Sequence, residues 1–317
     1  MSAPDQAPAP RPVALWRRAL PFVVAAALLT WVFTSIDWGE FVAAIVRTNI
    51  LGFVGFGLAF TVVLLAADAY ATSRVYRATV AEVSTADLFV VRGASYLPTM
   101  LNYHVGIAWM TWYMAKVKGA SLWRMSGATL IVYATTFGAL YVLGLAGAIL
   151  AGDRVAGLVP IVVGIGVAAI VYLAVLAWKP TFLTKRPLLS PLFETGVQGQ
   201  LVLFAQRLPH VAVLFVGTWA PFEFFGVHIP VEQAFALIPV ILLVLAFPIA
   251  PQGFGTRDAA ALFLLTGFYD GTPEAARAAI AASTISWGVL LTLIQLPLSL
   301  GLMAAARKRM QPPPQES

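Results

Sequence analysis

Long stretches without a charged residue alternate along the chain with short charged connections. Three runs, Met125–Gly152, Val155–Trp178 and Ala278–Ala306, contain no Asp, Glu, Lys or Arg. Each is longer than the roughly 20 apolar residues that a helix needs to cross a bilayer. The pattern therefore predicts an all-α, polytopic membrane protein.

Six apolar segments predict simple transmembrane helices, and two further uncharged segments carry helix-breaking residues. The broken segments are Gly93–Ala115 and Gln233–Thr256. Proline ends a helix because it lacks the amide donor and clashes with the preceding turn. We predict re-entrant helical hairpins here, with breaks at Pro98, Gly106, Pro248 and Pro251. The simple spans are Leu20–Ile36, Leu51–Tyr70, Met125–Leu150, Val155–Trp178, Leu203–Phe225 and Ala278–Met303.

The distribution of Lys and Arg favours hairpins over full crossings. With both hairpins re-entrant and the N-terminus cytoplasmic, Arg47, Arg154, Arg257 and Arg277 lie outside and the other 16 of the 20 basic residues lie inside. If both segments crossed the membrane fully, each side of the membrane would hold 10 of the 20 basic residues. Cytoplasmic loops of membrane proteins carry an excess of Lys and Arg. We therefore expect two re-entrant hairpins and cytoplasmic termini.

This arrangement predicts an inverted repeat. Each half holds three spans and one hairpin in the same order, and an odd number of crossings turns the second half upside down. Such repeats with broken helices recur in transporters, where the breaks mark the binding site. We predict one transmembrane domain over residues 19–306, with halves of about 19–152 and 153–306. Residues 1–18 are predicted to be a disordered cytoplasmic tail, and 307–317 a basic, proline-rich one.

Composition narrows the function classes. The 317 residues are 60% hydrophobic and 11% charged, carry a net charge of +6 and include no cysteine. Thiolate metal sites are excluded, and the three widely spaced histidines form no ligand motif. The chain lacks a nucleotide-binding P-loop, a G-x-S-x-G elbow and an H-E-x-x-H helix. We expect no metal, no cofactor and no enzymatic activity, and a positive surface that meets anionic lipid rather than nucleic acid.

The second hairpin carries the sharpest candidate site. Gly253 and Gly255 allow the backbone to turn tightly after two prolines, and Thr256 is a candidate N-cap for the helix that follows. The free amides of that first turn, together with Arg257, predict a site for a phosphate-bearing headgroup, with Asp258 balancing the arginine. The alternative is an ordinary Gly/Pro loop at the outer membrane surface.

Asn102 and His104 lie near the break of the first hairpin. If the two hairpins meet, these side chains complete a substrate-binding surface opposite Arg257 and Asp258. The alternative is that their polar groups only cap local backbone.

For two charged residues near the ends of predicted spans, we predict ordinary structural roles. Asp68, with Arg74 and Arg77 nearby, is expected to form an ion pair at the cytoplasmic boundary, and the alternative is a proton carrier. Arg207 is expected to extend its side chain to the cytoplasmic interface, as long basic side chains do near helix ends.

The stretch "FPIAPQGFGTRDAAALFLL" resembles the Pro-Gly-Gly-x-Gly-x-x-Glu signature of the flippase-like transmembrane domain of lysylphosphatidylglycerol synthases. Gln252 stands where that family has its first glycine, and Asp258 where it has glutamate. The segment "VVRGASYLPTMLNYHVGIAWMTWYMAKVKGASLWRMSGATL" is similar to the family's first conserved region, although the half-helix after Gly106 lacks the charged residue expected there.

The resemblance implies a stand-alone member without the soluble aminoacyl-transferase domain. Its expected function is to bind a polar phospho- or glycolipid and move it between the leaflets of a bacterial inner membrane. The alternative is a non-catalytic lipid-binding or scaffold subunit that serves a separate membrane glycosyltransferase or synthase. The expected partners are anionic or phosphate-bearing lipids and such a separate lipid-modifying enzyme.

Overall fold

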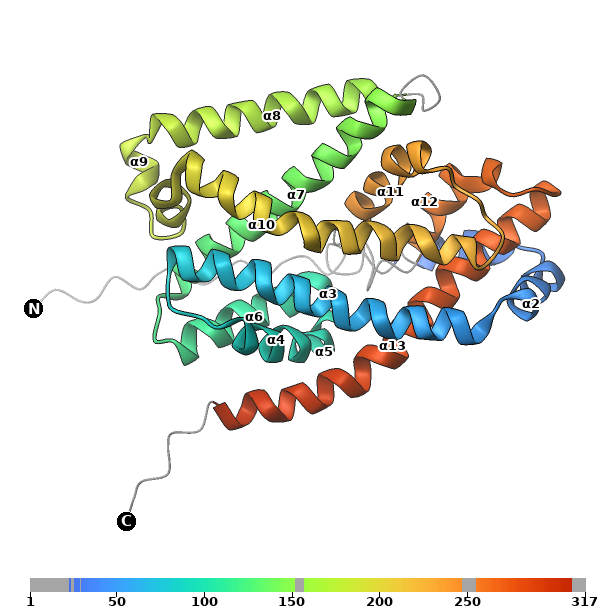
Figure 1. Cartoon of the computed structure of the whole chain (residues 1–317), viewed down its shortest axis with the longest axis horizontal. Coiled ribbons are helices and arrows are strands. Elements are labelled where there is room, and N and C mark those ends of the chain that lie inside the picture. The colour runs from blue at the N-terminus through green and yellow to red at the C-terminus, as the bar shows by residue number, and fades with distance from the viewer. Residues whose placement is uncertain (1–22, 24–25, 29, 152–156, 247–254, 310–317) are drawn as a thin grey trace, which may run out of the picture.

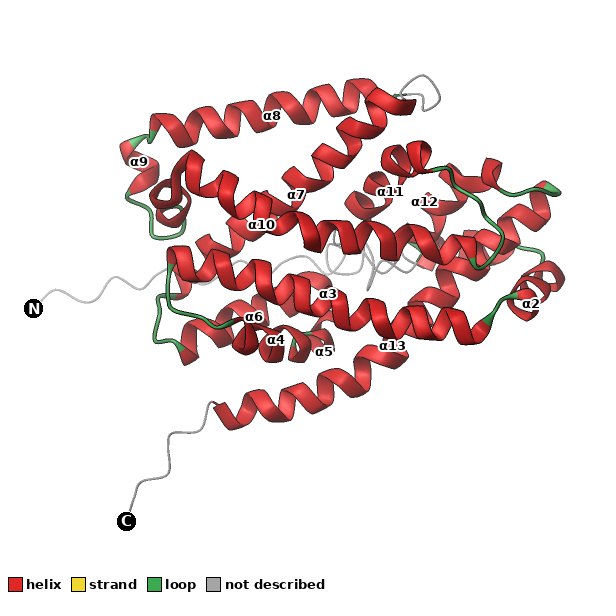
Figure 2. Cartoon of the chain, viewed as in Figure 1, coloured by secondary structure: helices red, strands yellow, loops and turns green. Residues whose placement is uncertain are grey.

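The computed structural model describes residues 23, 26–28, 30–151, 157–246 and 255–309. Helices joined by short loops make up this part of the chain, and it contains no strand (Figure 2). The all-α class is thereby confirmed. The helices are α2 (Trp38–Arg47), α3 (Ile50–Thr79), α4 (Thr85–Ala94), α5 (Tyr96–Thr99), α6 (Tyr103–Val117), α7 (Leu122–Ala151), α8 (Leu158–Trp178), α9 (Thr181–Thr184), α10 (Ser190–Glu223), α11 (Val231–Ala246), α12 (Thr256–Leu265), the 3-10 turn η2 (Thr266–Phe268) and α13 (Pro273–Arg309).

Within the described residues, five helices are long and apolar enough to cross a membrane: α3, α7, α8, α10 and α13. A sixth crossing is possible if Ala26–Thr34 and α2, which meet at 85°, are counted together. The 30 residues of α3 make a rod about 45 Å long, against a hydrocarbon core of about 30 Å. The chain is therefore a polytopic membrane protein, as its apolar runs predict.

The first hairpin consists of α4, α5 and α6. The 10 residues of α4 and the 15 of α6 rise about 15 Å and 22 Å, so neither crosses a bilayer. After α5 the chain turns back, and α6 packs against both α4 and α5. The break lies at Met100–Asn102, directly after the predicted Pro98, which belongs to α5.

Gly106 has a different role from the one its sequence suggests. It lies inside α6, one turn after the helix begins, so it is not a break. A Cβ atom at Gly106 would lie 1.9 Å from Thr99 Oγ1 and 2.9 Å from the Ser95 carbonyl oxygen. The glycine is needed for close approach between the two arms of the hairpin.

The second hairpin consists of α11 and α12, which pack against each other. The 16 residues of α11 and the 10 of α12 are again too few to cross. The connection between them, residues 247–254, includes the predicted breaks Pro248 and Pro251 and lies outside the described residues. The first hairpin lies toward one end of the molecule and α11–α12 toward the other (Figure 1).

The order and contacts of the helices repeat across the two halves. Helices α3 and α10 each precede a hairpin, run in opposite directions and pack together at the centre (Figure 1). Helix α4 of the first hairpin packs on α13, the last helix of the second half. In the same way, α11 of the second hairpin packs on α7, the last helix of the first half. This exchange of contacts is the arrangement that an inverted repeat produces.

Two glycines bring helices of different halves close together. A Cβ atom on Gly147 of α7 would lie 2.4 Å from backbone atoms of Ala236 in α11. A Cβ atom on Gly217 of α10 would lie 1.9 Å from the ring of Phe60 in α3. Small residues at membrane helix interfaces permit this approach.

Some predicted boundaries change. Helix α13 continues to Arg309, three residues into the segment 307–317 that is predicted as a basic, proline-rich tail. Helix α10 begins 13 residues before the predicted Leu203, and Gly196 (φ 63°, ψ −178°) bends its first turns. Residues 1–18 and the first part of the span Leu20–Ile36 lie outside the described residues.

Candidate functional site

Three charged side chains from three helices meet inside the bundle. Asp68 of α3 accepts from Arg92 Nε of α4 through Oδ2, at 2.5 Å, and from Arg207 Nη1 of α10 through Oδ1, at 2.6 Å. All three are buried, with side-chain exposures of 9%, 8% and 1% respectively. We call these three residues the Asp68 cluster.

Hydroxyl groups complete the hydrogen bonding of the cluster. Thr72, one turn after Asp68, donates to Asp68 Oδ1 and accepts from Arg207 Nη2, both at 3.1 Å. Ser95 accepts from Arg92 Nη1 at 2.9 Å. Charged groups are costly within a membrane and persist where they are paired and hydrogen-bonded to one another.

The sequence predictions for Asp68 and Arg207 are wrong. Arg74 lies over the ring of Tyr70, and Arg77 donates to the Val83 carbonyl and pairs with Glu82, so neither reaches Asp68. Arg207 does not extend to the interface, because the carboxylate and Thr72 hold it inside. Both residues lie well inside apolar helices. Because an intramembrane charge normally has a partner of opposite sign, this position could have indicated a buried ion pair.

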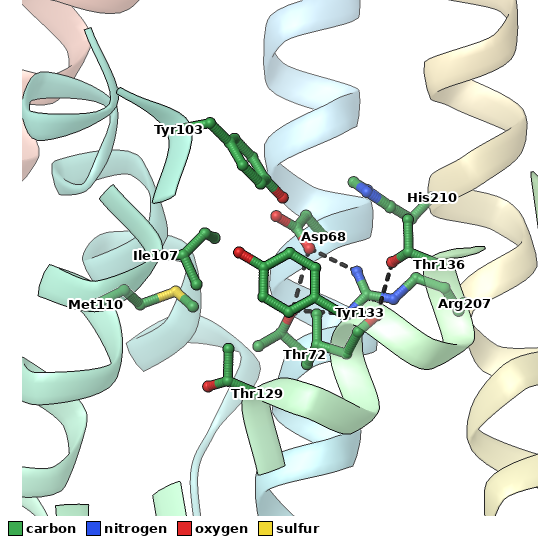
Figure 3. Close-up of a pocket in the computed structure, with 11 residues that line it drawn as sticks. Asp68, Thr72, Tyr103, Ile107, Met110, Thr129, Tyr133, Thr136, Arg207 and His210 are labelled. Carbon is green, nitrogen blue, oxygen red and sulfur yellow. Dashed lines mark hydrogen bonds and ion pairs between the residues drawn. The ribbon is translucent and has the colours of Figure 1, made fainter. Parts of the chain in front are cut away.

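A small pocket of about 10 Å³, room for about one water molecule, lies beside the cluster (Figure 3). Asp68 and Arg207 form part of its wall, and His210 projects into it from α10. Across from them, Tyr103 of α6 and Tyr133 of α7 bring hydroxyl groups to the same space. We call this the Asp68 pocket. Its remaining walls come from Thr72, Ile107, Met110, Thr129, Val132 and Thr136.

A second, larger pocket of about 150 Å³ lies at the second hairpin. Arg257 at the start of α12 lines it, together with Thr218 of α10 and Ser283 of α13. Ser283 is fully buried, and its hydroxyl has no hydrogen-bond partner among the described residues. We call this the Arg257 pocket. Apolar side chains from α3, α10, α11 and α13 form most of its wall.

Some residues predicted for the site at the second hairpin line the Arg257 pocket, and others form the first turn of α12. Arg257 lines the pocket and donates to the Thr284 carbonyl at 2.6 Å. Asp258 lies 3.5 Å from Arg257 but is fully buried, and its Oδ2 accepts the Gly255 amide at 2.9 Å. Asp258 therefore closes the first turn of α12 instead of facing the pocket. Gly255, at φ 82°, is the N-cap, and the buried Thr256 is the first helical residue rather than the cap. Gly253 lies outside the described residues.

The predicted residues of the first hairpin, Asn102 and His104, have partners within the protein. Asn102 is the N-cap of α6 and accepts the His104 amide at 2.8 Å. The His104 ring lies 3.0 Å from the Tyr133 hydroxyl. Neither residue lines the Asp68 pocket, whereas Tyr103 between them does. The capping alternative thus describes Asn102, and the first hairpin contributes Tyr103, which sequence reasoning missed.

Comparison with protein-family models, with curated proteins and with solved structures gave no match. Among the described residues, no group of three or more His, Cys, Asp or Glu side chains gathers in a way that suits a metal ion. The described residues define the class: an all-helical, polytopic membrane protein with two pockets inside its bundle, each lined by an arginine.

Proposed function

We propose that this protein is a flippase-like membrane protein that binds a polar phospho- or glycolipid and moves its headgroup between leaflets. One observation carries the proposal: two pockets, each with an arginine, follow one another along the central pair of helices α3 and α10. The acyl chains of such a lipid remain in the bilayer while the headgroup passes through the protein.

The spacing of the lining residues supports a route. On α3, Leu64 lines the Arg257 pocket and Asp68 lines the Asp68 pocket. On α10, Leu214 lines the Arg257 pocket and His210 lines the Asp68 pocket. Four residues of helix span about 6 Å. A headgroup leaving one pocket therefore needs to pass only about one helical turn to enter the other.

The chemistry of the walls suits a phosphate-bearing lipid. Arginine forms strong, charge-assisted hydrogen bonds to phosphate oxygens, and these gain strength away from bulk water. Arg257 receives the phosphate at the end of the molecule that holds the second hairpin, as its position in the sequence suggests. Asp258 fixes the turn that presents Arg257, and Gly255 and Thr256 shape the same turn.

The proposal includes an orientation. The charge asymmetry of the loops supports cytoplasmic termini, and the proposed location is a bacterial inner membrane. The first hairpin then enters from the cytoplasm and the second from outside. No nucleic acid, cofactor or covalent chemistry is part of this function.

Leaflet exchange in proteoliposomes tests the proposal. Wild-type protein is expected to accelerate exchange of a fluorescent phospholipid whose outer-leaflet copies are chemically bleached. Arg257→Gln is expected to slow exchange about 10- to 100-fold, the range for loss of one charged hydrogen bond. Arg277→Gln is the matched control, because Arg277 is an exposed cation on α13 that lines neither pocket.

The alternative is a lipid-binding or scaffold subunit for a separate lipid-modifying enzyme. The two pockets are separate in the structure, as they would be in a protein that holds lipid without moving it. Absence of exchange by wild type with anionic, zwitterionic and glycosylated lipids would contradict translocation and favour this alternative.

A further inference from the structure

The Asp68 cluster carries a surplus positive charge. Arg92 and Arg207 contribute one positive charge each, and both share the single negative charge of Asp68. The formal charge of the cluster is therefore +1. Among the residues that line the neighbouring pocket, Asp68 is the only carboxylate. An unbalanced charge inside an apolar bundle is costly, so the site favours one further negative charge.

Arg207 presents this surplus charge to the pocket. Arg92 does not line the pocket, and its guanidinium has further stabilising contacts, because it lies 5.5 Å from the ring centroid of Tyr96 and 5.9 Å from that of Tyr103. Arg207 lines the pocket, and its side chain is only 1% exposed. The attraction for a negative charge is therefore strongest on the Arg207 side of the cluster.

Two residues of the pocket wall carry a buried nitrogen atom that has no hydrogen-bond partner in the described part of the chain. The atoms are Arg207 Nε and His210 Nδ1. Arg207 Nε carries a proton and can only donate, so its partner must be an acceptor, and His210 Nδ1 donates as well when it is protonated. The hydroxyl of Tyr103 enters the same space (Figure 3). Buried polar atoms are normally satisfied, so these donors indicate an acceptor in the pocket.

The size of the pocket and its remaining chemistry restrict that acceptor. The volume of about 10 Å³ is room for about one water molecule. Three further hydroxyls of the wall are already bonded: Thr129 and Thr136 each donate to a carbonyl of their own helix, and the Tyr133 hydroxyl lies 3.0 Å from the His104 ring. The acceptor is therefore a single small species that few donors hold.

We propose that the Asp68 pocket binds one monatomic anion, such as chloride, in the conformation that the structure describes. Chloride is only slightly larger than water and accepts hydrogen bonds from any direction. Its charge neutralises the surplus of the cluster, which a water molecule would leave unbalanced. Both oxygens of Asp68 already hold an arginine, and this limits their repulsion of the ion. The inference goes beyond lipid handling and does not depend on it.

Thermal unfolding of the full chain in detergent tests the site. Chloride, bromide, sulfate and gluconate are compared at one pH and at equal ionic strength, so that surface charges are screened alike. Chloride and bromide are expected to raise Tm by about 3 °C over gluconate and to saturate, as a ligand of the native state does. Sulfate is too large to enter, and its general stabilising effect does not saturate. Absence of a saturable chloride effect would overturn the proposal and assign the pocket to a water molecule.

Two variants connect the effect to the pocket. Arg92→Gln cancels the surplus charge but keeps Arg207 Nε, and the chloride affinity is expected to fall at least about tenfold. Tyr103→Phe removes one oxygen atom from the pocket and is expected to lower the affinity about 2- to 10-fold, so the test does not depend on the folding of Arg92→Gln. Tyr172→Phe is the matched control, because this hydroxyl donates to Gln200 outside the pocket. Unchanged affinity in Tyr103→Phe, or an equal loss in Tyr172→Phe, would overturn the assignment of the ion to this pocket.

Discussion

At the scale of single residues, Asp68 is the most informative side chain. Each of its carboxylate oxygens holds a different arginine, one from the first hairpin and one from the second half of the chain. Loss of the carboxylate leaves two positive charges facing each other inside the bundle. Removal of the Asp68 carboxylate is therefore expected to destabilise the protein more than removal of either arginine.

Asp68→Ala is expected to destabilise the protein by about 3–5 kcal/mol, the usual result of breaking a buried ion pair from one side. The measurement is the change in Tm and in the free energy of unfolding in detergent. Arg74→Gln serves as the control, because Arg74 lies over the Tyr70 ring and outside the Asp68 cluster, so its loss should change stability by about 0.5 kcal/mol or less. A small effect of Asp68→Ala would show that the cluster contributes little to stability.

At the scale of helices, close contacts between the halves depend on glycine. Gly147 lets the backbones of α7 and α11 meet, and Gly106 lets the arms of the first hairpin close. Apolar burial does not drive association between helices in lipid, so van der Waals contact at such points contributes much of the stability.

Gly147→Ala is expected to destabilise the fold by about 1–3 kcal/mol, because a methyl group would meet the Ala236 backbone, which cannot rotate away. Thermal unfolding in detergent measures the effect. Gly164→Ala on α8 is the matched control: nothing lies within 4 Å of a Cβ atom there, so the change is expected to be neutral or slightly stabilising. Equal Tm values for the two variants would contradict the close contact.

At the scale of the whole molecule, the two pockets lie on either side of the middle of the α3–α10 pair. Asp68 and Thr72 belong to the half of α3 that leads into the first hairpin, while Phe60 and Leu64 belong to the half nearer α2. A headgroup route between leaflets requires this opposed placement.

Thiol labelling tests the opposed placement, and the chain is suited to it because it contains no cysteine. A charged, impermeant maleimide is expected to label Thr136→Cys from the cytoplasmic face and Thr218→Cys from the outer face. Leu293→Cys on α13 is the control, because this exposed apolar position faces lipid, where no reactive thiolate forms. Labelling of both pocket positions from the same face would indicate a single vestibule instead of two pockets.

The apolar runs and the placement of Lys and Arg were sufficient to predict the helices and the two short-armed hairpins. These features depend on local hydrophobicity and on charge near helix ends. The Asp68 cluster depends on which helices become neighbours, since its members are separated by 24 and 139 residues. Nothing in the residues around Arg92 or Arg207 specifies that choice, so a single sequence does not reveal it.

The position of the second hairpin's helix start is likewise a local feature, whereas what its side chains contact is not. The glycines and Arg257 mark the start of α12 from local sequence alone. Whether a polar side chain faces a cavity or its own backbone depends on the neighbouring helices. Asp258 bonds to its own turn, and Asn102 caps α6, whereas Tyr103 and Ser283 reach the pockets.

The spacing of the cluster members along the sequence also determines when each charge enters the membrane during synthesis. A lone aspartate raises the insertion cost of a helix by about 2.5–3.5 kcal/mol. Arg92 emerges from the ribosome 24 residues after Asp68, so a neutral pair forms while the first half is still being made. Arg207 follows 139 residues after Asp68, about 7–28 s later at ordinary rates of synthesis. The first half can thus enter the bilayer electrically balanced, and the surplus charge arrives only when the second half docks against it.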